Sequence, residues 1–318
     1  MRFCARILFS ESECYPAKAP SAQRPRRRSV FLPFFTRVIY LWLGLRQPVD
    51  HRARNKIFQP GFFHGCFRHR DAGFVGTLDR LSGVDDYAKV GAIMGAPLRL
   101  TPSETLGEDF MVPADAEMVI EGHVLPNVKE VEGPFGEFTG YYGPQRLRNV
   151  IEVSAITHRR DAVFQHIFTG HRDTWVLGGI PKEGSLFNLI RGVVPTVKAV
   201  HFPISGGCRF NCYISIDKKV DGETKQAALA ALGGCDFVKH VVVVDADIDI
   251  YNEEEVMWAV ATRVQADQDV DVIKNVKGNT LDPSQTDNIM TAKMIIDATK
   301  PVQRPYEARV AVPKTAME

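Results

Sequence analysis

The chain has 318 residues, of which 45% are hydrophobic, and a formal net charge of +1 at pH 7. This length and composition allow a sizeable core and favour two domains, and the near-neutral charge gives no reason to expect nucleic acid as a partner. The six cysteines are scattered without a Cys-x-x-Cys pair, which argues against a disulfide framework or a zinc-thiolate site and favours a reducing compartment.

Residues 1–77 differ in composition from the rest of the chain. A basic run of Arg24 and Arg26-Arg-Arg28 precedes an apolar stretch over residues 30–45 that Pro33 and Arg37 interrupt. We therefore do not interpret this stretch as a transmembrane helix. Three readings stay open: an organelle transit peptide, a basic membrane-surface segment, and sequence that is not native, translated from a wrong start or frame. We expect low order here.

The next periodic segment covers residues 83–98, where apolar residues recur at helical spacing. This spacing predicts a short helix. Asp85 and Asp86 stand at its amino-terminal end, where the helix dipole favours negative charge. Capping is therefore the structural interpretation of both aspartates.

Short runs rich in Val, Ile and Phe, separated by turns with Pro and Gly, predict strands that close into a barrel-like sheet. They cover residues 98–100, 117–121, 149–157, 162–168 and 210–216. Glu121 is either a pocket carboxylate or, more favoured by the pattern, a paired structural group. Glu117 is a similar but weaker candidate.

Two carboxylates flank a tight turn in Glu132-Gly-Pro-Phe-Gly-Glu137-Phe-Thr-Gly-Tyr-Tyr-Gly143. Glycine and proline make such a loop compact and rigid. If Glu132 and Glu137 line one water-poor pocket, repulsion and desolvation separate their pKa values and create an acid/base pair. The alternative is a surface turn with two solvated glutamates. Phe135 and Tyr141 are candidate pocket walls, with core packing as the alternative.

Polar donors gather beside aromatic residues in Phe164-Gln-His-Ile-Phe-Thr-Gly-His-Arg-Asp-Thr-Trp175. His171 and Arg172 could bind a carboxylate substrate, because arginine presents a bidentate fork and histidine adds a donor. A solvated loop is the alternative. A helix is predicted over residues 181–191.

After Pro195 the pattern predicts a compact α/β unit. Strands are expected over residues 197–202, 209–216 and 238–244, and helices over residues 224–232 and 253–265. Asp245, Asp247 and Asp249 share one face at a strand end, which suggests a metal site only superficially. We interpret them as turn and capping carboxylates, because the next helix starts directly after them.

The loop 131–143 resembles the active-site loop of the UbiD family of decarboxylases, which use prenylated flavin mononucleotide. Six further segments resemble the family in the same order, over about residues 78–313. They are Gly83-Val-Asp-Asp-Tyr87, Gly91-Ala-Ile-Met-Gly-Ala-Pro-Leu98, Val112-Pro-Ala-Asp-Ala-Glu-Met-Val-Ile-Glu-Gly122, Val244-Asp-Ala-Asp-Ile-Asp-Ile250, Leu281-Asp-Pro-Ser284 and Ile296-Asp-Ala-Thr-Lys-Pro301.

The resemblance implies a mixed α/β fold with an atypical segment 1–77, a partial split β-barrel, flavin-binding domain over 78–195, and a C-terminal α/β domain over 196–318. It implies reversible, non-oxidative decarboxylation of an aromatic, heteroaromatic or α,β-unsaturated acid. Glu137 is then the proton donor and Glu132 its partner. Asp86 stands where the family places an acidic ligand for Mn²⁺ or Mg²⁺. The resemblance also implies that the backbone carbonyl of Arg263 lies near a K⁺ site.

The resemblance also implies a flavin prenyltransferase as cofactor supplier, a homodimer or higher homo-oligomer, and a cytoplasmic location. The family takes an arginine, an asparagine and a histidine from its amino-terminal portion, and no matching stretch is visible in residues 1–77. We therefore favour the non-native reading of that segment. The alternative function is a truncated, non-catalytic homologue that acts as an assembly subunit of a larger decarboxylase.

Overall fold

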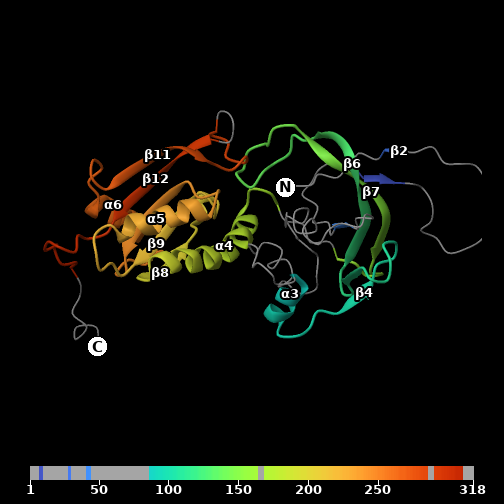
Figure 1. Cartoon of the computed structure of the whole chain (residues 1–318), viewed down its shortest axis with the longest axis horizontal. Coiled ribbons are helices and arrows are strands. Elements are labelled where there is room, and N and C mark those ends of the chain that lie inside the picture. Colours follow the sequence, from blue (N-terminus) through green and yellow to red (C-terminus); the bar gives the residue numbers. More distant parts are fainter. Residues whose placement is uncertain are drawn as a thin grey trace, which may run out of the picture. The chain divides into compact units, whose positions relative to one another are not determined.

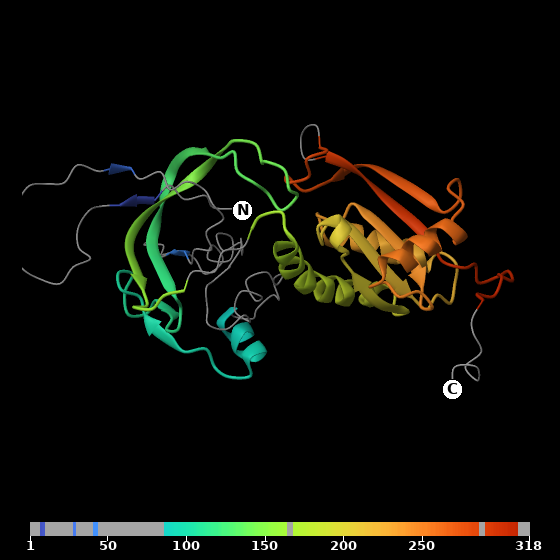
Figure 2. The ribbon, with the colours of Figure 1, turned by 180° about the vertical axis from the view of Figure 1, so that it is seen from behind.

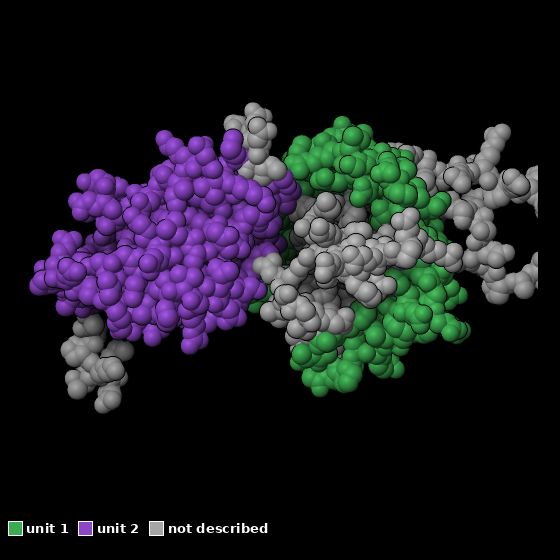
Figure 3. Space-filling model, in the orientation of Figure 1, with its two compact units in different colours: residues 1–181 green, residues 182–318 purple. Residues whose placement is uncertain are grey.

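The structure is a computed structural model that describes residues 7–9, 28–29, 41–43, 86–163, 168–285 and 290–310. The chain divides into two compact units, residues 1–181 and 182–318 (Figure 3). Apart from three short strands, the predictions for residues 1–77 concern a stretch outside the described residues. The predicted domain boundaries at 77/78 and 195/196 stay predictions.

A long antiparallel ribbon dominates the first unit (Figure 1). It consists of β6 (Met118–Glu132) and β7 (Arg146–His158), and Figure 2 shows from behind how strongly it curves. Three short strands extend it into a sheet of order β2-β1-β7-β6-β3. These strands are β1 (Ile7–Phe9), β2 (Arg28–Ser29) and β3 (Leu41–Leu43). The predicted runs 117–121 and 149–157 lie almost entirely within the ribbon, as expected.

The remaining elements of this unit are short. They are α3 (Asp86–Met94) and the antiparallel pair β4 (Leu100–Pro102) and β5 (Met111–Pro113). Among the described residues, the edge strands β2 and β3 of the larger sheet do not pair with each other, so the sheet is not a closed barrel there. The strand expected over residues 162–168 is not seen in the part that the structure describes.

The second unit is an α/β layer whose sheet has the order β11-β12-β10-β9-β8. The three central strands β9, β10 and β12 are parallel, and the edge strands β8 and β11 are antiparallel to their neighbours. The strands are β8 (Val197–His201), β9 (Asn211–Ile216), β10 (His240–Asp245), β11 (Val270–Lys277) and β12 (Met290–Ala298). The helical elements are η1 (Ile204–Gly206), α5 (Glu223–Gly234) and α6 (Glu253–Arg263). The strands β8, β9 and β10 and the helices α5 and α6 match the predicted ones within a few residues, whereas η1, β11 and β12 were not predicted.

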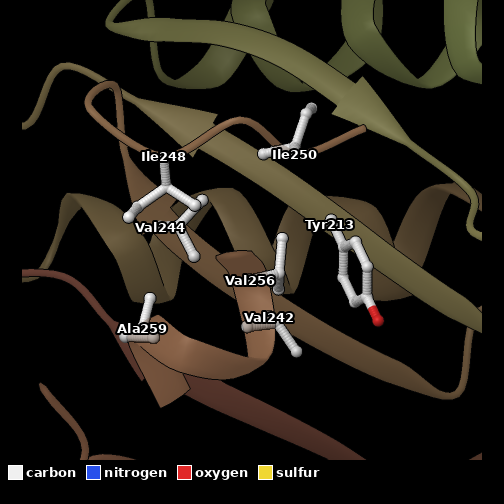
Figure 4. Packing of buried hydrophobic residues seen from close by; sticks show 8 residues of the cluster. Tyr213, Val242, Val244, Ile248, Ile250, Val256 and Ala259 are labelled. Carbon is white, nitrogen blue, oxygen red and sulfur yellow. The ribbon is translucent and has the colours of Figure 1, made fainter. Parts of the chain in front are cut away.

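Burial explains why these segments form central strands. Val241, Val243 and Val244 on β10 are fully buried, as is typical of a parallel strand covered on both faces. Figure 4 shows Val242 and Val244 packed with Val256 and Ala259 of α6. Cys212 on β9 is also fully buried, and burial raises the pKa of its thiol well above the usual value.

Helix α4 (Arg172–Val193) begins about nine residues before the predicted start at residue 181. The sequence misleads because Pro181 lies inside the helix, and proline is usually found at a first turn, where its missing N–H costs nothing. Here the buried positions Thr174, Leu186 and Ile190 hold the helix against its neighbours on both sides of the proline. Among the described helices, none is long and apolar enough to cross a bilayer.

Candidate active site

The loop between β6 and β7 is folded back on itself. The Glu137 N–H donates to the Tyr141 carbonyl at 2.9 Å, and the Gly140 N–H donates to the Glu137 carbonyl at 3.0 Å. A third bond joins the Gly143 N–H to the Phe135 carbonyl at 2.9 Å. The backbone of Glu137 is thus tied on both its N–H and its carbonyl, which makes this loop a rigid support for a side chain.

Both carboxylates of the loop are buried. Glu132 is 8% exposed and Glu137 is 7% exposed, so the alternative of two solvated glutamates does not hold. Glu132 ends β6 and accepts a hydrogen bond from Arg148 Nε on β7 at 3.1 Å. Its opposite neighbour in the ribbon is Arg146, and Arg148 therefore reaches it from the diagonal position on the same face.

The Glu137 side chain lies against a glycine. A Cβ built on Gly143 would stand 3.0 Å from Glu137 Cγ and 3.1 Å from its Oε1. Contacts this short are tighter than side chains normally make, so any larger residue at 143 would displace the carboxylate. This close approach is the physical reason for a glycine after the tyrosine pair.

The aromatic residues of the loop divide into two groups. Phe138 is a core residue with 2% exposure, and Phe135 is half-buried. Tyr141 and Tyr142 are 64% and 81% exposed. In this structure the phenylalanines can exclude water from the loop, whereas the tyrosines face outward.

His171 and Arg172, the candidate carboxylate binders, are both exposed. Arg172 is the first residue of α4, and His171 precedes it and accepts the Trp175 N–H at 3.1 Å through its carbonyl. The predicted loop is therefore a helix start. The structure places neither side chain in a described pocket, and a role in substrate binding stays a prediction.

Glu121 is a structural carboxylate. It is 1% exposed and accepts the Glu104 N–H at 2.8 Å, the Thr105 N–H at 2.7 Å and the Thr105 hydroxyl at 2.6 Å. Burial alone would raise its pKa, but the hydrogen bonds from Thr105, Glu104 and Ser103 outweigh burial and lower it. The paired reading of Glu121 fits this geometry, because the loop after β4 wraps the carboxylate.

We expect Glu121→Gln to lower the free energy of unfolding by about 2 kcal/mol at neutral pH, because an amide turns its NH₂ toward buried donors. A lowered folded-state pKa means that the stabilisation is present above the ordinary glutamate pKa and is lost as the pH falls through the folded value. Urea unfolding at neutral pH and near pH 4 measures this difference, which should shrink in acid. The matched control is Glu108→Gln at an exposed position. Equal effects of both changes at neutral pH would contradict the assignment.

Asp86 is the first residue of α3. An open hollow of about 550 Å³ runs along this helix, and it is lined by Tyr87, Ala88, Gly91, Ala92 and residues 95–98. Neither Glu132 nor Glu137 lines it. Within residues 86–163, 168–285 and 290–310, no group of three or more His, Cys, Asp or Glu side chains could hold a metal ion.

Arg263, the other candidate at the cofactor, makes buried ion pairs in the second unit. Its Nη1 lies 2.7 Å from Asp245 and its Nη2 lies 3.0 Å from Asp247. Burial raises the pKa of Asp245, whereas hydrogen bonds from Arg263 and Lys300 lower the pKa of Asp247 in spite of burial. The side chain of Arg263 is thus structural.

The third aspartate of that strand end, Asp249, serves a turn. Its carboxylate accepts the Tyr251 N–H at 2.9 Å, and the Asn252 side chain caps α6 by accepting the Glu254 N–H. The interpretation as turn and capping carboxylates therefore fits Asp249, whereas Asp245 and Asp247 instead form ion pairs with Arg263.

Two family models match the chain. The 3-octaprenyl-4-hydroxybenzoate carboxy-lyase Rift-related domain matches residues 73–172. The 3-octaprenyl-4-hydroxybenzoate carboxy-lyase C-terminal domain matches residues 175–298. The junction between the two matches falls at the first turn of α4.

Among curated proteins, the chain is 37% identical over 243 residues to the phenolic acid decarboxylase of Sedimentibacter hydroxybenzoicus. The alignment covers 74% of this chain and 50% of the relative. The chain thus spans about half the length of the curated relatives it matches.

Among solved structures, it resembles the UbiD-class enzyme HmfF from Pelotomaculum thermopropionicum in complex with FMN. That match has 46% identity and a TM-score of 0.74, and it covers 79% of this chain and 56% of that one. An evolved dimeric form of HmfF in complex with prFMN matches with 43% identity and a TM-score of 0.68, over 78% and 54%. The carboxylate loop, the mixed α/β fold and these matches agree, and the chain belongs to the UbiD family.

Proposed function

We propose that this chain carries the proton-transfer loop of a prenylated-FMN-dependent decarboxylase. Its substrate would be an aromatic, heteroaromatic or α,β-unsaturated carboxylic acid, and the reaction would be non-oxidative and reversible. The observation that carries the proposal is the burial of Glu132 and Glu137 on one rigid loop, at 8% and 7% exposure. The phenolic acid decarboxylase relative and the flavin complexes of HmfF support the substrate class and the cofactor.

The two carboxylates would have different tasks. When bound, prenylated FMN supplies the electron sink that loss of carbon dioxide from an unsaturated carbon requires. By the family resemblance we assign the delivery of the proton to Glu137, and Glu132, which Arg148 contacts at 3.1 Å, is its partner carboxylate. Glu137 would protonate the carbon after carbon dioxide leaves, and the reverse step would take the proton back. Phe138, which is fully packed beside it, helps to exclude competing water.

The remaining parts of the proposal rest on the family alone. On this basis we propose Mn²⁺ or Mg²⁺ near Asp86 and K⁺ near the Arg263 carbonyl. A flavin prenyltransferase would supply the cofactor, and the protein would be a cytoplasmic homo-oligomer. Asp86, Arg263, His171 and Arg172 stay predicted contacts of cofactor or substrate.

The test is reconstitution of the full chain. It is co-expressed with a flavin prenyltransferase, purified without oxygen, and assayed for the bound flavin spectrum and for carbon dioxide release from phenolic acids. We expect flavin bound in stoichiometric amount to the chain, and carbon dioxide release above that of the flavin-free chain. A well-folded chain that binds no flavin at saturating cofactor would contradict the proposal and favour a non-catalytic assembly subunit.

A further inference from the structure

The segment that follows β7 and runs into the first turn of α4 contacts the carboxylate loop at two points, and these two contacts play no part in the chemistry described so far. Its residues, 168–175, are remote in sequence from the loop but lie beside it within the first unit. They supply neither acid nor base to the loop. The geometry instead indicates a mechanical role.

The first contact is a hydrogen bond from a tryptophan. Trp175, in the first turn of α4, donates its indole N–H to the carbonyl of Phe138 at 2.6 Å. Phe138 directly follows Glu137 and is 2% exposed. This bond therefore fixes the peptide between Phe138 and Thr139, one residue after the carboxylate-bearing residue, in a part-buried place.

The second contact is backbone against backbone. Gly170 adopts φ +73°, and a Cβ placed on it would stand 2.9 Å from Gly140 Cα and 3.2 Å from the Glu137 carbonyl oxygen. Only glycine combines this left-handed conformation with so close an approach. Gly170 therefore contacts the backbone of Glu137 and Gly140, and Trp175 binds the carbonyl of Phe138.

The helix start that holds Trp175 is itself fixed. The Thr174 hydroxyl donates to the Phe168 carbonyl at 2.9 Å, and the Trp175 N–H donates to the His171 carbonyl at 3.1 Å. Thr174 is 6% exposed. The indole is therefore presented from a short, internally bonded segment and not from a free side chain.

We propose that Trp175 is a positioning residue that sets the direction of the Glu137 carboxylate. Together with the bonds inside the loop, it gives the peptides around Glu137 three fixed points: the Glu137 N–H, the Glu137 carbonyl and the Phe138 carbonyl. A displacement of about 1 Å at a reacting group can cost about 100-fold in rate. The catalytic part of this inference rests on the proposed function, whereas the mechanical part does not.

The test is Trp175→Phe, which keeps an aromatic ring and removes the N–H. We expect kcat to fall on the order of tenfold while KM changes less than about twofold. Amide exchange of Glu137 and Gly140 should become at least about tenfold faster, with exchange of the buried Val150 unchanged. Trp258→Phe on α6 is the matched control for loss of one indole, and it should change neither quantity.

The outcomes separate the two ideas. If the unaltered chain releases no carbon dioxide, the proposed function fails, and amide exchange alone decides the positioning role. If the unaltered chain is active and Trp175→Phe keeps its kcat and its loop exchange, the positioning role is wrong. A purely structural residue would instead lower the melting temperature and speed exchange along the whole β6–β7 ribbon, with kcat per folded molecule unchanged.

Should Trp175→Phe fail to fold, the unaltered chain still provides the test. The three tryptophans give separate indole N–H signals in ¹⁵N-labelled protein. A bonded indole of Trp175 should exchange with deuterium far more slowly than that of the 40% exposed Trp258. Equal exchange rates for these two indoles would overturn the inference.

Discussion

Glu137→Gln is expected to abolish turnover of the flavin-loaded chain while flavin binding persists. The substitution keeps the size of the side chain, and so its contact with Gly143, but it removes the transferable proton. General acid catalysis contributes about 10² to 10⁴ in rate, and a loss in this range is the expected result. The measurements are carbon dioxide release under saturating substrate and the absorbance of the bound flavin on the same sample.

The matched control for this change is Glu152→Gln. Glu152 is also a glutamate of the ribbon, but it is exposed on β7. Its variant should keep full activity and flavin content. Activity of Glu137→Gln within about twofold of the unaltered chain would show that another group delivers the proton. Loss of flavin together with activity would instead indicate that Glu137 supports the cofactor site.

Arg263→Leu should destabilise the second unit by about 3 kcal/mol. The side chain is 3% exposed and pairs with Asp245, at 16% exposure, and with Asp247. Removing one partner of a buried ion pair leaves the other charges uncompensated, which costs about 3–5 kcal/mol. Contacts from Lys300 to both aspartates persist, so we expect the lower end of this range.

Urea unfolding followed by circular dichroism measures this effect. Arg309→Leu is the control, because Arg309 also pairs with a carboxylate, that of Glu255, and also stacks on Trp258, but its side chain is 43% exposed. Surface pairs contribute about 0–1 kcal/mol. Similar losses for the two variants would mean that the Arg263 pairs are not the buried support that the structure describes.

Three of the five strands of the α/β unit, and its helices α5 and α6, could be predicted from the sequence, whereas β11 and β12 were missed. Buried parallel strands such as β10 are continuous apolar runs, and α5 ends at a Gly pair, so each carries a local signal. The start of α4 could not be found in this way, since Pro181 is normally a sign of a first turn. The packing of Leu186 and Ile190 overrides that local signal.

The candidate site was only partly predictable. The turn residues around Glu132 and Glu137 signal a rigid loop, and the family resemblance selects both acids. Arg148 was missed because the loop from residue 133 to residue 145 leaves the register of β7 against β6 undetermined in the sequence. Trp175 and Gly170 were missed because a contact between segments more than 30 residues apart leaves no local pattern.

Proton transfer by Glu137 can be measured without following carbon dioxide at all. The decarboxylated aromatic product is incubated with the flavin-loaded chain in D₂O, and deuterium at the carbon that had carried the carboxylate is followed by NMR. If Glu137 passes a proton to and from that carbon, the unaltered chain incorporates deuterium there and Glu137→Gln does not. Equal incorporation by both chains would contradict the assignment of this buried carboxyl group as the proton donor.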